Sequence, residues 1–372
     1  MPPKEIVLVL DVSNSMNETI KGTKVKRIDA LKNAANNFLD AMERVPNLKI
    51  GIVTYGTTAE IKRTRIDWVN TALINSSNVN ELKGIINNIR ISGGADGGTN
   101  TGDGLRRAAY LLNNSSESNI NANKTIVIMS DGMPTYHLDE FDRDSRNYKY
   151  YKDISKEGLG GYQGAELDGS GNSDRDLENT NYAIEIGKII DTNGYNVFSI
   201  GYGLSNKVDK GEKLSSLDKI KLIHGSMIGS NIQDNKIIDG TVINEEKGFY
   251  ETDEGAIDSV FQQIADEIIN SYPVNNVALN MEFNKGFSLN IGGDTVNIGT
   301  VNYKKDPTAK DGDKVRYIAD PIPFEFTIKG SIEGTQLVFK DLSLSYKWEN
   351  EPKKKTIDEN VEVTINPNEL PN

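Results

Sequence analysis

The chain has 372 residues, of which 37% are hydrophobic and 26% are charged, and it carries a formal net charge of −12. This length predicts two or three domains, and the composition is typical of a chain that folds around a core. The acidic balance argues against nucleic acid and anionic membranes as partners, because both need a basic surface. No apolar run approaches the roughly 20 residues of a membrane span, so we expect no span.

Cysteine is absent, and the only two histidines are His137 and His224. A disulfide scaffold is therefore excluded. We expect any metal site to use oxygen ligands rather than thiolate or imidazole, which favours a hard cation. The expectation for His137 is a surface loop, and the expectation for His224 is a helix C-terminal cap.

Apolar runs and helically spaced apolar residues alternate over the first 270 residues. Short runs rich in β-branched residues predict buried strands at 6–10, 48–55, 59–66, 125–129 and 195–201. Apolar residues at helical spacing predict helices at 27–39, 81–89, 105–112, 182–190 and 256–269. This order predicts an α/β fold with a doubly wound, mostly parallel sheet that carries helices on both faces.

Two segments interrupt this alternation. Residues 136–177 form an insertion rich in Asp, Gly, Ser and Tyr. The insertion follows the carboxyl end of the strand at 125–129. Two interpretations stay open: a solvated loop, or a surface whose tyrosines contact a ligand. Its residues Asp168, Asn172, Asp174 and Asp176 resemble a loose run of calcium ligands, but a solvated acidic loop is the favoured account. The second segment is 204–247, in which residues 209–219 are charged and expected to be peripheral.

The pattern changes at Pro273, after which apolar and other residues alternate with period two. This alternation predicts strands at 277–283, 324–328, 342–346 and 361–365. We therefore expect an all-β, sandwich-like region of antiparallel strands. The predicted division is a domain at 1–271, with its insertion at 136–177, and a β-rich accessory domain at 272–372.

Polar side chains follow two of the predicted strands and one glycine-rich turn. Asp11, Ser13 and Ser15 come directly after the first strand, and Asp131 follows the strand at 125–129. Thr99 lies in the turn at 97–102. The carboxyl ends of parallel strands share one edge of a sheet, so these oxygens are expected to converge there. Singly, each residue also suits a helix cap or a turn, but that account does not explain the set.

This ordered set resembles the metal-ion-dependent adhesion site of the von Willebrand factor A (vWA) family. The DxSxS motif is Asp11, Ser13 and Ser15, the distant threonine is Thr99, and the strand-end aspartate is Asp131. The resemblance covers about residues 4–271 and implies that these five residues bind Mg²⁺, with Mn²⁺ or Ca²⁺ as alternatives. It also implies an open metal position that a Glu or Asp of a protein ligand completes.

A vWA domain followed by β modules resembles Gram-positive surface adhesins and pilus-tip proteins. The implied function is metal-dependent cell adhesion, with a matrix protein such as collagen as one candidate partner; the alternative is an assembly subunit of a surface or pilus complex. The implied location is the cell surface. The chain starts within a few residues of its first strand, so we expect a piece trimmed of signal and anchor.

An enzyme is the rival class, and we expect none. Neither histidine lies in a nucleophile motif. A phosphoryl-transfer site would need a basic clamp, and the nearby Arg106 and Arg107 are expected to face solvent from a helix.

Overall fold

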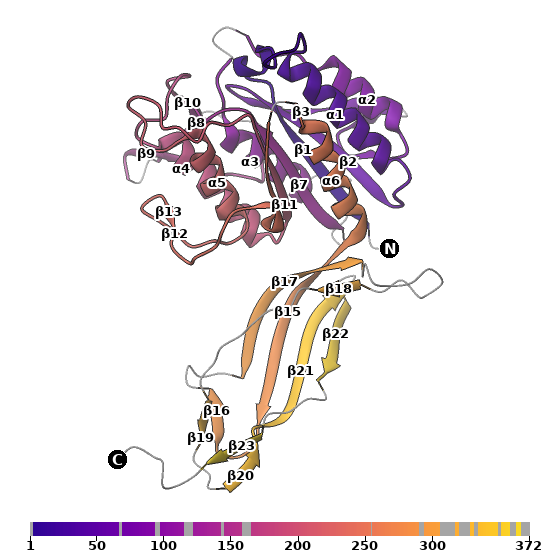
Figure 1. The fold of residues 1–372 in the computed structure, drawn as a ribbon, viewed down its shortest axis with the longest axis vertical. Helices are drawn as coiled ribbons and strands as arrows, with labels where there is room; N and C mark the ends of the chain where they lie inside the picture. The colour runs from indigo at the N-terminus through magenta and orange to yellow at the C-terminus, as the bar shows by residue number, and fades with distance from the viewer. Residues whose placement is uncertain are drawn as a thin grey trace. The chain divides into compact units, whose positions relative to one another are not determined.

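The chain divides into two compact units, Met1–Ile269 and Asn270–Asn372. The division falls after Ile269, whereas the predicted boundary falls after residue 271. The computed structural model describes residues 3–66, 69–93, 97–114, 122–142, 145–157, 165–253, 255–289, 294–305, 317–319, 328–330, 334–348, 351–357 and 362–365 (Figure 1).

A seven-stranded sheet forms the centre of the first unit. The strand order is β14-β11-β7-β1-β2-β3, and β6 also pairs with β2. The five strands from β14 to β2 are parallel, while β3 and β6 run antiparallel to β2. The strands are β1 (Lys4–Asp11), β2 (Leu48–Tyr55), β3 (Ala59–Lys62), β6 (Ile74–Asn75), β7 (Asn123–Ser130), β11 (Asn196–Tyr202) and β14 (Phe249–Thr252). The prediction of a mostly parallel sheet is confirmed.

Helices cover both faces of this sheet (Figure 1). On one face lie α1 (Arg27–Met42), α2 (Val79–Asn88) and α6 (Ile257–Asn270). On the other face lie α3 (Thr101–Asn114), α4 (Glu178–Thr192) and α5 (Ser216–Met227). Successive residues of β1 point to opposite faces, so Leu8 packs in one core and Val9 in the other, both fully buried. The apolar run that predicts a strand buried on both faces is therefore confirmed.

Helix α5 occupies a segment that the sequence analysis left without a helix. It begins at a capping interaction in which Ser215 Oγ accepts from the Asp218 backbone N–H and donates to Asp218 Oδ2. Its apolar residues Leu217, Ile220 and Ile223 are buried against the sheet. The expectation that residues 209–219 are peripheral is wrong at Lys219, which is fully buried.

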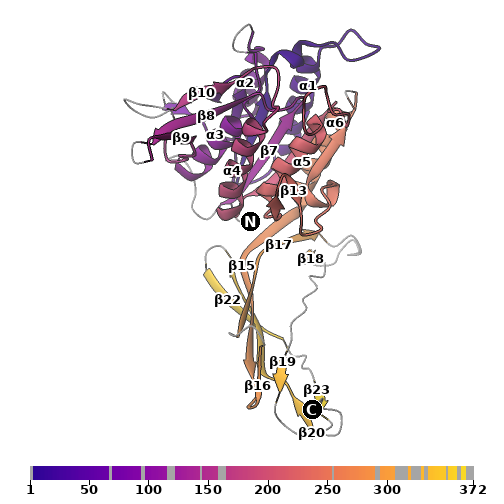
Figure 2. The ribbon, with the colours of Figure 1, turned by 90° about the vertical axis from the view of Figure 1, so that its left-hand side faces the viewer.

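The insertion is ordered into a three-stranded antiparallel sheet over its described residues. Its strands, in the order β10-β8-β9, are β8 (Tyr136–Asp142), β9 (Asn147–Tyr150) and β10 (Glu166–Gly169). Leu138 of β8 is fully buried in the same core as α3 and α4, and Figure 2 shows the small sheet beside these helices. Two short hairpins complete the unit: β4 (Thr64–Ile66) with β5 (Val69–Thr71), and β12 (Ile232–Gln233) with β13 (Lys236–Ile237).

The second unit contains antiparallel sheets, as predicted. Its main sheet has five strands in the order β18-β17-β15-β21-β22, and two further pairs are β16-β19 and β20-β23. The strands are β15 (Ser271–Phe283), β16 (Phe287–Leu289), β17 (Thr295–Lys305), β18 (Tyr317–Ala319), β19 (Ile328–Gly330), β20 (Gly334–Leu337), β21 (Phe339–Trp348), β22 (Glu351–Thr356) and β23 (Glu362–Ile365). Most of the strand predicted at 324–328 lies outside the described residues, as does residue 361.

Within the part of the chain that the structure describes, no helix combines the length and the apolar character needed to cross a membrane.

Candidate metal centre

Strand β1 ends at Asp11, and a short 3₁₀ turn over Asn14–Asn17 follows directly. This turn folds the chain back, so that the Ser13 backbone N–H donates to Asp11 Oδ1 over 2.9 Å. The hydroxyls of Ser13 and Ser15 then lie 3.0 Å apart. Asp11 and Ser13 are buried and Ser15 is half-buried, so the oxygens of the DxSxS motif share one small region at the sheet edge.

Asp131 meets this turn from the neighbouring strand. Strands β1 and β7 are paired in parallel, so their carboxyl ends lie side by side. Ser15 Oγ donates to Asp131 Oδ1 over 2.7 Å, and Ser130 Oγ donates to Asp11 Oδ2 over 3.4 Å. The structure therefore joins Asp11, Ser13, Ser15 and Asp131 in one hydrogen-bonded cluster.

Thr99 approaches the same cluster from the loop before α3. Its backbone is held by Thr135: the Thr99 N–H donates to Thr135 Oγ1 over 2.8 Å, and the Thr99 carbonyl accepts from the Thr135 N–H over 2.7 Å. A Cβ built on Gly132 would lie 3.9 Å from Ser15 Oγ and 4.0 Å from Thr99 Oγ1. Both hydroxyls thus face the space above Gly132, which a larger residue would fill.

The two carboxyl groups of the cluster are buried close to one another. Burial, and then the charge of Asp131, raises the pKa of Asp11 above its usual range. Burial also raises the pKa of Asp131, while its hydrogen bond from Ser15 and the charge of Arg27 act in the opposite direction. Arg27 Nη1 lies 3.1 Å from Asp131 Oδ2. Two buried carboxylates need positive charge nearby, and a bound cation would supply it.

The donor set fits the metal that the resemblance implies. Carboxylate and hydroxyl oxygens are ligands that Mg²⁺ accepts, and no nitrogen or sulfur ligand belongs to the cluster. Asp11, Ser13, Ser15, Thr99 and Asp131 are the residues that would hold the ion, and their assignment as ligands stays a prediction.

A cavity of about 410 Å³ opens beside the cluster. Ser15, Thr99 and Gly132 line it from the sheet edge, while Tyr136 and residues 170–172 line it from the insertion. The Tyr136 ring is packed onto Gly98, where a Cβ would lie 2.2 Å from Tyr136 Cε2. The insertion therefore forms one wall of the space next to the candidate metal ligands.

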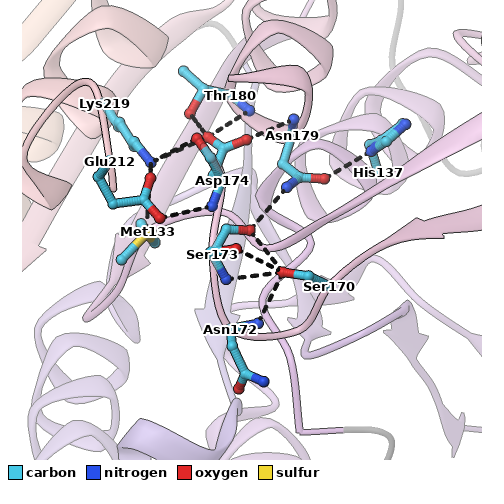
Figure 3. A network of polar contacts seen from close by, with 10 residues as sticks. All are labelled: Met133, His137, Ser170, Asn172, Ser173, Asp174, Asn179, Thr180, Glu212 and Lys219. Carbon is cyan, nitrogen blue, oxygen red and sulfur yellow. Dashed lines mark hydrogen bonds and ion pairs between the residues drawn. The ribbon is translucent and has the colours of Figure 1, made fainter. Parts of the chain in front are cut away.

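The sequence analysis did not predict the buried charged side chains that hold the insertion in place. Lys219 Nζ lies 2.7 Å from Glu212 Oε2 and 3.4 Å from Asp174 Oδ2, and it donates to Met133 Sδ at 3.5 Å (Figure 3). Asp174 also accepts from the backbone N–H groups of Asn179 and Thr180 at the start of α4. Asp174 is thus a buried helix cap and ion-pair partner, so the solvated-loop account is wrong for this residue.

Arg106 is a second missed anchor, and the expectation that it faces solvent is wrong. Its side chain is fully buried. It donates to the carbonyls of Asp153, Lys156 and Glu157 over 2.9 to 3.2 Å, and to Asp103 Oδ1 over 2.9 Å. The guanidinium therefore attaches the insertion to α3. Arg107, by contrast, is partly exposed.

His137 does not lie where the sequence analysis placed it, whereas His224 lies at the C-terminal end of a helix, as expected. His137 is only 3% exposed, on β8 rather than on a surface loop. His224 lies in the last turn of α5, fully buried, with Nδ1 2.7 Å from Ser199 Oγ and Nε2 2.8 Å from the Lys247 carbonyl oxygen.

Several solved structures are similar to part of this chain. The PilB minor pilin from Streptococcus sanguinis is 18% identical, with 72% of this chain and 62% of that chain covered and a TM-score of 0.47. The pilus adhesin SpaC from Lactobacillus rhamnosus GG is 14% identical, with 96% and 43% covered and a TM-score of 0.46. The vWF domain of the pili tip protein Mfa5 from Porphyromonas gingivalis is 16% identical, with 72% and 95% covered and a TM-score of 0.45. This chain thus spans less than two thirds of the PilB and SpaC chains.

A comparison with curated proteins finds no match. The family model described as von Willebrand factor type A domain matches residues 6–133. That segment runs from β1 to just beyond Asp131, so it includes every residue of the candidate metal centre. The chain therefore contains a von Willebrand factor type A domain.

Proposed function

We propose that the chain is a metal-dependent adhesion module that binds a protein ligand through an acidic side chain. The observation that supports this most directly is the hydrogen-bonded cluster of Asp11, Ser13, Ser15 and Asp131 at the carboxyl edge of a vWA sheet. A divalent cation there, with Mg²⁺ as the first candidate, would keep much of its charge because hydroxyls are neutral ligands. That charge favours a carboxylate from the partner.

The cavity beside the cluster supports the same proposal. Its volume of about 410 Å³ suits a protruding side chain with its neighbours rather than a whole folded surface. Its walls come from both the sheet edge and the insertion, so a partner group at the metal would also contact Tyr136. The chain's own residues therefore orient the partner, while burial around Asp11 excludes water from one side.

The proposed setting is the surface of a bacterial cell, because an adhesion site must face the partner outside the cell. The partner is a matrix protein such as collagen, or another subunit when the chain serves in the assembly of a surface or pilus complex.

We propose no catalytic step. Within the described residues, the Ser199 hydroxyl lies 2.7 Å from His224 Nδ1, as a nucleophile would lie beside its base. Both side chains, however, are buried. The cavity that Ser199 borders measures only about 10 Å³, too small for a substrate. The pair is accounted for by the hydrogen bonds that hold α5 on β11.

The test combines a metal titration with a binding screen. Calorimetric titration of the whole chain with Mg²⁺ is expected to show one site that Asp11→Asn abolishes, because the variant removes a buried ligand charge while keeping the side-chain shape. Glu43→Gln is the matched control: it neutralises an exposed carboxylate just after α1 that belongs to no contact of the cluster described above. Wild-type Mg²⁺ affinity in a folded Asp11→Asn protein would contradict the metal assignment.

The binding screen uses collagen and other immobilised matrix proteins, each measured in Mg²⁺ and in EDTA. We expect binding to at least one of them in Mg²⁺ only, and its loss in Asp11→Asn. Binding that persists in EDTA would exclude the proposed mechanism even if the metal titration succeeds.

A further inference from the structure

The insertion brings one histidine and two aspartates together on a single face of its small sheet. In the β8–β10 ladder, His137 lies directly opposite Asp168, and Asp139 follows two residues along β8. Residues paired across a ladder, and residues two apart on one strand, point to the same face. One ligand-type atom from each of the three side chains lies within 4.8 Å of the others.

The imidazole of His137 is held in one orientation by a partner outside this cluster. Its Nδ1 lies 2.7 Å from Asn179 Oδ1, and the Asn179 side-chain amide donates to the Ser173 carbonyl (Figure 3). An amide oxygen only accepts, so Nδ1 carries the proton and donates it. In the neutral ring, the Nε2 lone pair then points toward the carboxylates, and Nε2 lies 3.3 Å from Asp139 Oδ2. A histidine whose second nitrogen is tied back in this way is typical of metal ligands.

The burial of this imidazole distinguishes the cluster from an ordinary acidic surface. His137 is 3% exposed, and the rings of Tyr150 and Tyr182 pack around it with centroids at 5.6 Å and 6.4 Å. Among the residues that the structure describes, the polar contact of Nε2 is with Asp139 of the cluster itself. Asp168 lies on the exposed side, so an ion could enter from solvent.

The two aspartates also lack a permanently charged partner. Over the described ranges, neither Asp139 nor Asp168 forms an ion pair with a lysine or arginine, whereas the neighbouring Glu140 and Asp142 both face Lys149. The surroundings are acidic as well, because Glu166 lies directly opposite Asp139 in the β8–β10 ladder. Two carboxylates beside a buried imidazole therefore leave negative charge that a cation would balance.

We propose that His137, Asp139 and Asp168 form a second metal site, distinct from the Asp11–Asp131 cluster, that binds Zn²⁺. Imidazole favours zinc over magnesium, and three protein ligands with one open position are a common zinc arrangement. The ion would join β8 to β10 and so brace the insertion that walls the cavity beside Ser15 and Thr99. Because the sequence has only two histidines, the sequence analysis expected no imidazole ligand. The register of the β8–β10 ladder nevertheless places His137 beside two aspartates.

The test titrates the whole chain with Zn²⁺ and compares matched variants. Asp168→Asn removes an exposed ligand charge and leaves the fold unstressed, and Asp139→Asn removes the second. Each is expected to weaken Zn²⁺ binding by more than about 100-fold, since even outer partners of metal ligands are worth about 10- to 100-fold. Glu140→Gln, on the same strand but paired with Lys149, is the control and is expected to stay within about threefold of wild type.

A second readout observes the ligand nitrogen directly. The chain has only two histidines, so ¹⁵N-histidine spectra contain two rings. Zn²⁺ is expected to shift Nε2 of His137 and leave buried His224 unchanged, also in an Asp11→Asn background that lacks the first site. Unaltered His137 signals at saturating Zn²⁺, or unchanged Zn²⁺ affinity in Asp168→Asn, would overturn the proposal and leave a His137–Asp139 ion pair as the account of the cluster.

Discussion

Arg27 Nη1 donates to Asp131 Oδ2 over 3.1 Å, so a permanently charged guanidinium contacts one of the candidate metal ligands. Arg27 is the first residue of α1, and the same guanidinium nitrogen lies 3.2 Å from Glu18 Oε2 on the surface. The second oxygen of Asp131 accepts from Ser15. The guanidinium thus compensates part of the negative charge that a cation would otherwise balance.

This contact predicts that Arg27→Gln tightens Mg²⁺ binding. Removing a positive charge next to a ligand carboxylate removes repulsion with the incoming cation, and we expect about a tenfold gain in affinity, or about 1.4 kcal/mol. Isothermal titration at low ionic strength measures it. Lys26→Gln is the control, because it removes the same charge from the neighbouring residue. The exposed side chain of Lys26 donates to Asn17 instead. Weaker Mg²⁺ binding in Arg27→Gln would show instead that the guanidinium positions Asp131 for the ion.

Much of the sheet and of the candidate site could be predicted because both depend on local patterns. Continuous apolar runs such as residues 6–10 must be buried on both faces, and parallel pairing then brings the strand ends at Asp11 and Asp131 to one edge. Hydrogen bonds from Ser15 and the backbone of Ser13 follow from the tight turn after β1.

The buried charges could not be predicted, because most of their partners are distant in the sequence. Arg106 is buried only because the carbonyls of residues 153–157 fold over it, about 50 residues later, and Lys219 is buried only because Asp174 and Glu212 reach it. A charged residue on a helix carries no local sign of such partners. The signal that was available for α5 was the Ser215–Asp218 cap before an apolar repeat.

The buried position of Arg106 predicts a large loss of stability in Arg106→Lys. A lysine cannot donate to three carbonyls and Asp103 at once, so we expect a loss of about 3 kcal/mol in the free energy of unfolding. Denaturant titration measures this loss, and limited proteolysis is expected to cut the insertion first, within residues 145–157. Arg107→Lys, on the partly exposed neighbour, is expected to change stability by less than about 0.5 kcal/mol. Equal midpoints for the two variants would contradict the anchoring role of Arg106.

His224 predicts a pH dependence of stability. Burial lowers the pKa of His224 from its ordinary value of 6.5 to about 4, with its hydrogen bond to the Lys247 carbonyl acting the other way. Between pH 6.5 and pH 4 the unfolded chain binds a proton at this residue that the folded chain does not, so stability falls as the pH falls through this range. The loss approaches about 3 kcal/mol at pH 4.

The measurement is the unfolding free energy of wild type and His224→Gln from pH 7.5 to pH 4. The variant cannot take up this proton, so its stability deficit relative to wild type should narrow as the pH falls, while titration of the many carboxylates is common to both proteins. A deficit that stays constant with pH would mean that His224 titrates in the folded protein near its ordinary pKa.

Gly98 predicts a separation of metal binding from partner binding. Its backbone N–H donates to Thr57 Oγ1 over 3.0 Å, so the loop is held in place, and a Cβ would lie 2.2 Å from Tyr136 Cε2. In Gly98→Ala the Tyr136 ring must therefore leave its position at the wall of the cavity. We expect Mg²⁺ affinity within about threefold of wild type, which is less than 1 kcal/mol, and binding of the matrix protein identified in the Mg²⁺ screen to weaken by about tenfold or more.

Gly93→Ala is the matched control, because a Cβ at Gly93 has no atom within 4 Å and should leave both affinities unchanged. Calorimetry gives the Mg²⁺ affinity and surface-based binding kinetics give the partner affinity of each variant. If Tyr136 only shields the metal, Gly98→Ala would lower both the Mg²⁺ affinity and the partner affinity. If Tyr136 contacts the partner, Gly98→Ala lowers the partner affinity alone. Unchanged partner binding in Gly98→Ala would remove Tyr136 and the insertion from the binding surface, since the displaced ring is the part of the insertion that packs onto the metal-bearing loop.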